Sequence, residues 1–250
     1  LDQVIRQEAA GFGTIYFLAR MLEHQGETLE GKRLAISGFG NMSWGVCRKS
    51  AELGGKVVAI AGPDGYIYDP DGAVTDEKIN YLLEMRASGR DKVQDYADKF
   101  GCEFHAGEKP WGLGADKVDI MMPCATQNDV NMDSAKKIAA SGIKYYIEVA
   151  NMPTTNDALE FLKEQKHMVI APSKAVNACG VAVSALEMAQ NAERLYWTAE
   201  EVDAKMHQIM ANIYHSSVAA AERYGLGYDL VAGANIVGFQ RVADAMMAQG

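Results

Sequence analysis

The stretch KRLAISGFGNMSWGVCRKSAELGGKVVAIA, residues 32–61, decides the fold class. Apolar runs at Leu34–Ile36 and Val57–Ala61 predict two strands, and a helical segment lies between them. Gly38 permits a tight turn, and Gly40, without a side chain, lets the backbone approach a pyrophosphate at the N-terminus of the helix. A bare GxG would also fit an ordinary strand–helix turn, but strand, glycine turn, helix and strand in this order predict dinucleotide binding.

The rest of the chain alternates predicted strands with helices and then becomes helical. This pattern predicts an α/β fold, a doubly wound, mostly parallel Rossmann-like sheet with helices on both faces and a helical C-terminal segment. We treat residues 1–250 as a single dinucleotide-binding domain, with a junction helix in 1–30, the sheet and crossover helices in 31–177, and C-terminal helices in 178–250. The later strands are expected at 118–122, 144–149 and 168–171, and helices at 6–24, 76–85, 90–100, 183–192, 198–224 and 234–248.

Composition disfavours several classes of protein. The net charge of −9 argues against nucleic acid, which requires clustered Lys and Arg, and against anionic membrane surfaces. No apolar run approaches the ~20 residues of a membrane-spanning helix. The four cysteines and five histidines show no metal-binding spacing, so we predict no metal site and reduced thiols in a cytoplasmic protein.

Further stretches resemble the glutamate dehydrogenases, and the bacterial, clostridial-type enzymes are the most similar. They follow in the family's order along almost the whole chain: GFGNMSWG at 38–45, GPDGYIYDP at 62–70, PCATQN at 123–128, EVANMPTT at 148–155, AVNACGV at 175–181 and GANIVGF at 233–239. The chain is identified by this resemblance as the isolated C-terminal cofactor-binding domain, and one strand of its sheet is expected to run antiparallel.

The resemblance also implies an activity. The complete enzyme would deaminate L-glutamate reversibly to 2-oxoglutarate and ammonia with NAD. The catalytic residues belong to a substrate domain that we expect to be absent here, so the chain alone would be inactive. That domain also makes most contacts of the family's hexamer, and we expect a monomer or a weak dimer. Removing it should expose apolar residues near Arg6–Phe12 and along Ile236–Met247.

The predicted cofactor site lies beyond the carboxyl ends of the strands, although turns and helix caps use the same residue types. Asp64 follows the second strand, where an acid binds ribose hydroxyls and repels a 2′-phosphate, and no Lys or Arg lies between Lys56 and Lys78; NAD is therefore favoured over NADP. Asp64 could instead initiate a turn. We predict the following cofactor residues: Arg6, Gly38, Phe39, Gly40, Asn41, Met42, Pro63, Asp64, Cys124, Ala125, Thr126, Gln127 and Asn151. The resemblance supplies Arg6, Thr126, Gln127 and Asn151, and the others follow from their positions in the loops.

The resemblance adds Val181 and Ser184 as contacts to substrate, although a serine in a helix also bonds back to a carbonyl one turn earlier. Ala10 and Gln7 depart from the family's usual threonine and proline, and Cys179 from its usual glycine. Cys124 is interpreted as a small buried hydrophobe in preference to a nucleophile. Two alternatives stay open: the cofactor domain of a leucine- or phenylalanine-type dehydrogenase, and a stand-alone NAD-binding module.

Overall fold

The computed structural model describes the backbone of residues 4–250 and the side chains from Ala9 onward. Its strands are β1 Arg33–Ser37, β2 Lys56–Gly62, β3 Gly65–Tyr68, β4 Glu103–Ala106, β5 Ile120–Pro123, β6 Tyr145–Ile147 and β7 Val169–Ala171. Its helices are α1 Val4–His24, α2 Asn41–Glu52, α3 Asp76–Ala87, α4 Gln94–Phe100, η1 Pro110–Gly112, α5 Met132–Ser141, α6 Asn156–Lys163, α7 Ser173–Val176, α8 Ala178–Glu193, α9 Ala199–Arg223 and α10 Leu230–Gln249.

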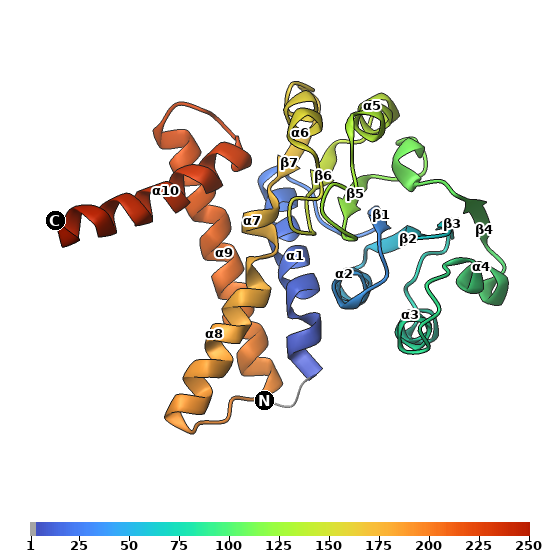
Figure 1. Cartoon of the computed structure of the whole chain (residues 1–250), viewed down its shortest axis with the longest axis horizontal. Coiled ribbons are helices and arrows are strands. Elements are labelled where there is room, and N and C mark those ends of the chain that lie inside the picture. Colours follow the sequence, from blue (N-terminus) through green and yellow to red (C-terminus); the bar gives the residue numbers. More distant parts are fainter. Residues whose placement is uncertain (1–3) are drawn as a thin grey trace.

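The strands form a seven-stranded sheet in the order β4-β3-β2-β1-β5-β6-β7 (Figure 1). β3 runs antiparallel to both of its neighbours, and the other pairs are parallel. The chain builds outward from β1 to one edge, then returns beside β1 with β5, which is the strand reversal of a doubly wound fold. This confirms the predicted fold class and the single antiparallel strand.

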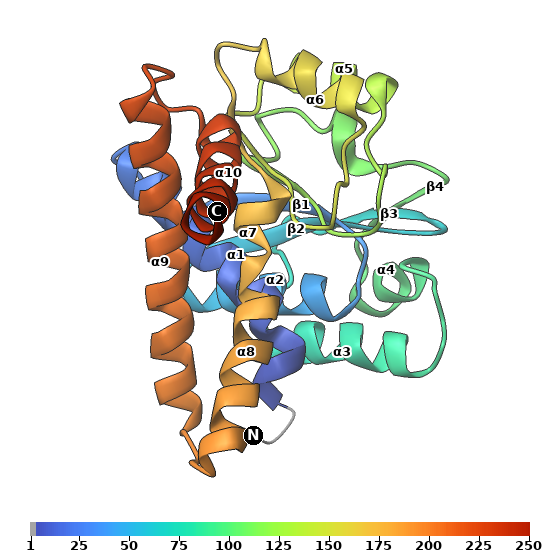
Figure 2. The ribbon, with the colours of Figure 1, turned by 60° about the vertical axis from the view of Figure 1, so that its left-hand side comes forward.

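Helices cover both faces of the sheet, and each face has its own apolar core. Figure 2 shows α2, α3 and α4 on one side and α5 and α6 on the other. On the first side Leu34 and Ile36 of β1 pack with residues of α1 to α4. On the second, Ala35 packs with Trp111 of η1 and with residues of α5 and α6. Alternate residues of one strand thus face opposite layers, as the pleat of a strand requires.

The helices α8 and α9 pack against α1 beside the sheet. The OH group of Tyr16 in α1 donates a hydrogen bond to Asp203 in α9. α9 begins at a capping box, in which Thr198 Oγ1 accepts from Glu201 N–H at 3.2 Å and the Glu201 carboxylate accepts from Thr198 N–H at 2.7 Å. α10 lies against α9 at its start, and its C-terminal half projects away from the rest of the chain (Figure 1). From Val4 onward, none of the helices has the length and apolarity needed to cross a bilayer.

The structure corrects some predicted boundaries. Residues 65–68, where no strand was predicted, form β3, which turns back from β2 at Pro63-Asp64 and pairs Gly65 with Gly62. A Cβ at Gly65 would lie 2.2 Å from the carbonyl oxygen of His105 in β4, so the close approach of these strands depends on glycine. The helix expected at 90–100 begins only at Gln94, and the strand expected at 144–149 is limited to β6.

Candidate functional site

The glycine loop between β1 and α2 takes the shape that the sequence predicts. Gly38 has a φ of +78°, and a Cβ on it would lie 2.9 Å from Cα of Ala125, so this turn requires glycine. Gly40 is the N-cap residue of α2 with a φ of −77°. Ser43, which stands where a third glycine is usual, is 1% exposed, so a small side chain fits between the helix and the sheet.

The N-terminus of α2 opens toward the carboxyl ends of the strands. Its first helical hydrogen bond runs from Trp44 N–H to Gly40 O at 2.9 Å. The N–H groups of Asn41, Met42 and Ser43 therefore have no acceptor within the helix. Together with the positive end of the helix dipole they form a ready site for an anion such as a phosphate.

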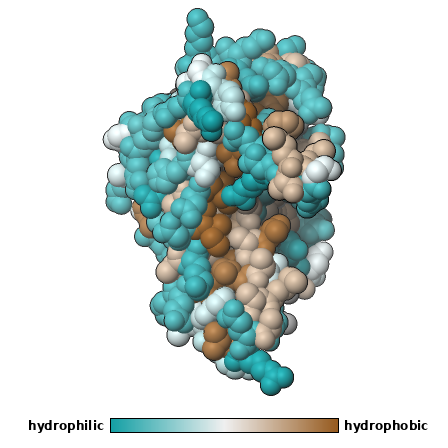
Figure 3. All heavy atoms as spheres, turned by 90° about the vertical axis from the view of Figure 1, so that its left-hand side faces the viewer, coloured by the Kyte–Doolittle hydropathy of each residue, from teal (hydrophilic) through white to brown (hydrophobic). Residues whose placement is uncertain are grey.

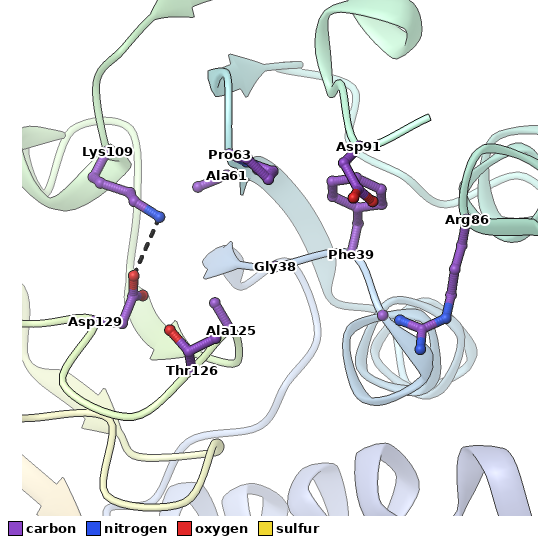
Figure 4. A pocket seen from close by; sticks show the side chains of 12 residues that line it. Gly38, Phe39, Ala61, Pro63, Arg86, Asp91, Lys109, Ala125, Thr126 and Asp129 are labelled. Atoms are coloured by element: carbon purple, nitrogen blue, oxygen red, sulfur yellow. Dashed lines mark ion pairs between the residues drawn. The ribbon is translucent and has the colours of Figure 1, made fainter. Parts of the chain in front are cut away.

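A cavity of about 380 Å³ lies in front of this loop, within the size range of cofactor sites (Figure 4). Arg86 and Asp91 lie at one side of it, and Lys109 and Asp129 at the other (Figure 4). The lining residues come from β2 and α3, from the segments that follow β1, β2, β5 and α3, and from the segment before η1. They are Gly38, Phe39, Gly40, Ala61, Gly62, Pro63, Arg86, Asp91, Lys109, Ala125, Thr126 and Asp129.

Asp64 does not line the cavity, although its neighbour Pro63 does. Its two carboxylate oxygens accept hydrogen bonds from the N–H groups of Val93 at 2.9 Å and Gln94 at 3.1 Å. The carboxylate therefore caps the start of α4, which explains why that helix begins later than predicted. The turn-forming alternative for Asp64 is thus present in the structure, and any contact with a ribose would add to it.

The loop after β5 places some predicted residues in the cavity and hides another. Ser37 Oγ accepts hydrogen bonds from the N–H groups of Cys124 at 3.1 Å and Ala125 at 3.3 Å, which fix the loop to β1. Ala125 and Thr126 line the cavity. Cys124 is 7% exposed, and its burial raises the pKa of the thiol well above the usual value. It is a packed hydrophobe here, while Gln127 lies exposed at the rim of the loop.

Other predicted residues lie outside the cavity lining. Asn151 is exposed, and its Oδ1 accepts a hydrogen bond from Asn177 Nδ2 at 2.8 Å. Ser184 Oγ donates to Gly180 O at 3.2 Å, so its hydroxyl bonds back one turn, and Val181 is 77% exposed on the same helix. Asn41 and Met42 are half-buried at the start of α2. The side chain of Arg6 lies outside the described residues.

Cys179 fits without distorting α8. A Cβ on Gly13 of α1 would lie 2.1 Å from Cys179 Cβ, so the two helices touch where glycine faces cysteine. Burial raises the pKa of the Cys179 thiol to about 12. In the part of the chain that is described, no three His, Cys, Asp or Glu side chains gather as a metal site would require.

Sequence reasoning missed the charged residues of the cavity: Arg86, Asp91, Lys109 and Asp129. The cations of the cavity lie further along the chain than the segment between Lys56 and Lys78, which contains none. Arg86 reaches the glycine loop from α3, so near that a Cβ on Gly40 would lie 2.4 Å from its Nη1 atom. Asp129 directly follows the PCATQN motif, and this position was the one signal in the sequence that could have placed it at the cavity.

Comparisons with known proteins agree with this geometry. The family model of the glutamate, leucine, phenylalanine and valine dehydrogenases matches residues 3–250. The chain is 67% identical over 247 residues to the NAD-specific glutamate dehydrogenase of Clostridium symbiosum, covering 99% of this chain and 54% of that protein. It is 47% identical over 249 residues to the NADP-specific glutamate dehydrogenase of Escherichia coli, covering 99% of this chain and 54% of that protein.

A solved structure of a glutamate dehydrogenase superposes with a TM-score of 0.96 at 67% identity, covering 98% of this chain and 54% of that one. The chain thus spans about half the length of the curated relatives that it matches. Because the family model covers nearly every residue, the chain belongs to the glutamate, leucine, phenylalanine and valine dehydrogenase family.

Proposed function

We propose that this chain binds NAD(H) and acts as the cofactor-binding part of a glutamate dehydrogenase. The observation that carries the proposal is the glycine loop, where the free N–H groups of α2 open onto a cavity at the strand reversal. A Cβ at Gly40 would lie 2.4 Å from Nη1 of Arg86, so the loop needs glycine to leave room beside a cation that suits a phosphate. The two relatives described above are both named glutamate dehydrogenases.

The chain's own residues would hold and orient the cofactor. The α2 N-terminus would bind the pyrophosphate, Pro63 and Asp64 would face the adenosine ribose, and the loop from Ala125 to Gln127 together with Asn151 would face the other half of the dinucleotide. The nicotinamide, when bound, accepts or returns the hydride of the reaction. A carboxylate at the end of β2 favours the ribose hydroxyls over a 2′-phosphate, which supports NAD over NADP.

We place glutamate and 2-oxoglutarate as the substrates of the complete enzyme, with Val181 and Ser184 on the wall of α8 that would face them. We expect no turnover from this chain alone, because its relatives are about twice as long. The described cysteines are all free thiols, which supports a reducing compartment and hence the cytoplasm.

An exposed apolar surface supports the proposal that the chain meets a partner surface in the complete protein, where the family resemblance implies a hexamer. On the face formed by the C-terminal helices an apolar band runs between hydrophilic areas (Figure 3). Phe239 is 73% exposed and Met246 69% exposed, as predicted for this helix, whereas Phe12, expected to be exposed, is 8% exposed because it packs in the core. A surface of this kind favours association, and we propose a monomer in equilibrium with a weak dimer.

Thermal unfolding with and without NADH tests the proposed function. A ligand that binds only the folded state at ~100 times its dissociation constant adds about 2.7 kcal/mol to the free energy of unfolding. For a chain of this size that is a rise of roughly 5–10 °C in the melting temperature. NADPH at the same concentration is expected to give a smaller rise. An unchanged melting temperature at saturating NADH would contradict the proposal, and production of NADH from NAD and glutamate by the pure chain would contradict the expected lack of turnover.

A further inference from the structure

The side chain of Asp129 has an unusual environment. It is 7% exposed, and its Oδ1 pairs with Lys109 Nζ at 3.1 Å. Its Oδ2 is buried and has no hydrogen-bond partner. A buried carboxylate oxygen without a partner costs free energy unless something donates a hydrogen bond to it. Because Asp129 lines the cavity in front of the glycine loop, and a carboxylate turns easily about its terminal torsion, the missing donor is expected to come from a ligand toward which this oxygen turns.

The position of Lys109 and Asp129 within the cavity indicates which part of the ligand they would contact. If the pyrophosphate lies at the α2 N-terminus and the adenosine ribose at the end of β2, the base lies beyond the ribose, away from the helix. Lys109 and Asp129 are at that end, across the cavity from Arg86 (Figure 4). Between them the cavity is lined by Ala61 and Pro63, whose small apolar surfaces suit the flat face of a base.

The chemistry of the pair matches adenine. Adenine carries an exocyclic N6 amine, which donates, next to ring nitrogens, which accept. A carboxylate accepts from such an amine, as Asp and Glu do from the amine of cytosine. The ammonium of Lys109, a donor only, complements a ring nitrogen. Hypoxanthine carries a carbonyl oxygen in place of the amine, and its lone pairs would face the Asp129 carboxylate.

We propose that Asp129 Oδ2 accepts a hydrogen bond from the N6 amine of the adenine and thereby selects adenine over hypoxanthine in the dinucleotide. This inference rests on the proposed function, because it assumes that the cavity binds NAD(H). Lys109, 39% exposed at the rim, holds the carboxylate in place through its ion pair. Asp129 is thus a specificity-determining residue that takes no part in the hydride transfer.

The test compares NADH with reduced nicotinamide hypoxanthine dinucleotide, which differs at this position of the base. Fluorescence titration of the wild-type chain should give NADH an affinity roughly tenfold to a hundredfold higher, the range for a hydrogen bond to a buried charged group. In Asp129→Asn the amide donates to the carbonyl oxygen of hypoxanthine, so the ratio should fall to about one or reverse. Asp133→Asn makes the same chemical change at an exposed residue of the next helix and should keep the wild-type ratio.

The outcomes separate the two proposals. If the wild-type chain binds neither dinucleotide, the proposed function fails. If it binds both equally, or if Asp129→Asn weakens both to the same extent with an unchanged ratio, the role of Asp129 in base selection is refuted while NAD binding stands. Should Asp129→Asn fail to fold, Asp129→Ser, a smaller neutral replacement, provides the same comparison, and a wild-type ratio in that variant would equally refute the inference.

Discussion

Replacing Gly40 by valine should severely weaken dinucleotide binding while the chain still folds. Gly40 has φ −77° and ψ −170°, a backbone conformation that valine also adopts. Its Cβ would lie 2.4 Å from Nη1 of Arg86. That atom is the end of a flexible, exposed side chain, which moves aside at little cost. We therefore expect the free energy of unfolding to change by less than about 1 kcal/mol.

The loss of binding is much larger, because the valine side chain would occupy the space in front of the α2 N-terminus. A hydrogen bond from a backbone N–H group to a charged phosphate contributes about 1.5 kcal/mol or more. If two such bonds are lost, the dissociation constant rises roughly a hundredfold. NADH fluorescence titration measures the change, and circular dichroism with thermal unfolding checks the fold. A folded Gly40→Val chain that binds NADH within threefold of the wild type would refute this account of the loop.

Two other glycine substitutions serve as controls with opposite expected results. Gly38 has a φ of +78°, and its added Cβ would lie 2.9 Å from the backbone of Ala125, which cannot move aside cheaply. Gly38→Ala should therefore lower the stability by about 2 kcal/mol or more. Gly238 in α10 has no atom within 4 Å of an added Cβ. Gly238→Ala should leave binding unchanged and raise the stability by a few tenths to about 1 kcal/mol.

Three further predictions concern stability and assembly. Asp69→Ala removes a carboxylate 5% exposed that pairs with Lys78 Nζ at 2.6 Å, and should lower the free energy of unfolding in urea by about 3 kcal/mol; a loss below 1 kcal/mol would contradict the role of this pair. Glu27 has its pKa lowered to about 2 by hydrogen bonds from its Lys and Tyr neighbours, so its stabilising effect is full above about pH 4.5 and is lost as the pH falls toward 2. Glu27→Gln should therefore be about 1 kcal/mol less stable at pH 7, after solvent screening, with the difference vanishing near pH 2; a difference that persists there would show that the charge is not its source. The double substitution Phe239→Ser and Met246→Ser should weaken self-association in sedimentation experiments without lowering the melting temperature, since both side chains are exposed.

Much of the fold could be predicted because its signals are local. The strand, glycine turn, helix and strand at the start of the sheet lie within residues 32–61, and the long C-terminal helices have their own caps, such as Thr198. The short strands β3 and β4 could not be predicted in this way. β3 exists because Gly65 pairs with Gly62 on one side and Ala106 on the other, and pairing across distant segments leaves little trace in a short sequence window.

In the candidate site, too, the residues with local sequence signals could be predicted and the others could not. Gly38, Gly40, Pro63, Ala125 and Thr126 were predicted, and they line the cavity because they belong to turns that follow strands. The cationic side chains of the cavity lie outside these turns. Arg86 lies on α3, and Lys109 precedes η1, so only the packing of these elements against the sheet brings them to the cavity. The position of a charged side chain relative to the cavity therefore cannot be predicted from the sequence until the packing of its helix or loop is known.

Asp64 illustrates how one side chain links folding to recognition. α4 is only seven residues long, too short to be stable without tertiary contacts, and the Asp64 carboxylate supplies hydrogen bonds to the N–H groups at its start. The same bonds hold the carboxylate at the end of β2, where a ribose would meet it already oriented. A substitution at Asp64 would therefore change the start of α4 and the proposed ribose contact together, so a loss of affinity there would have two physical sources. Substitution at Gly40 would act on the proposed phosphate contact alone, which is why the glycine loop gives the sharper test of dinucleotide binding.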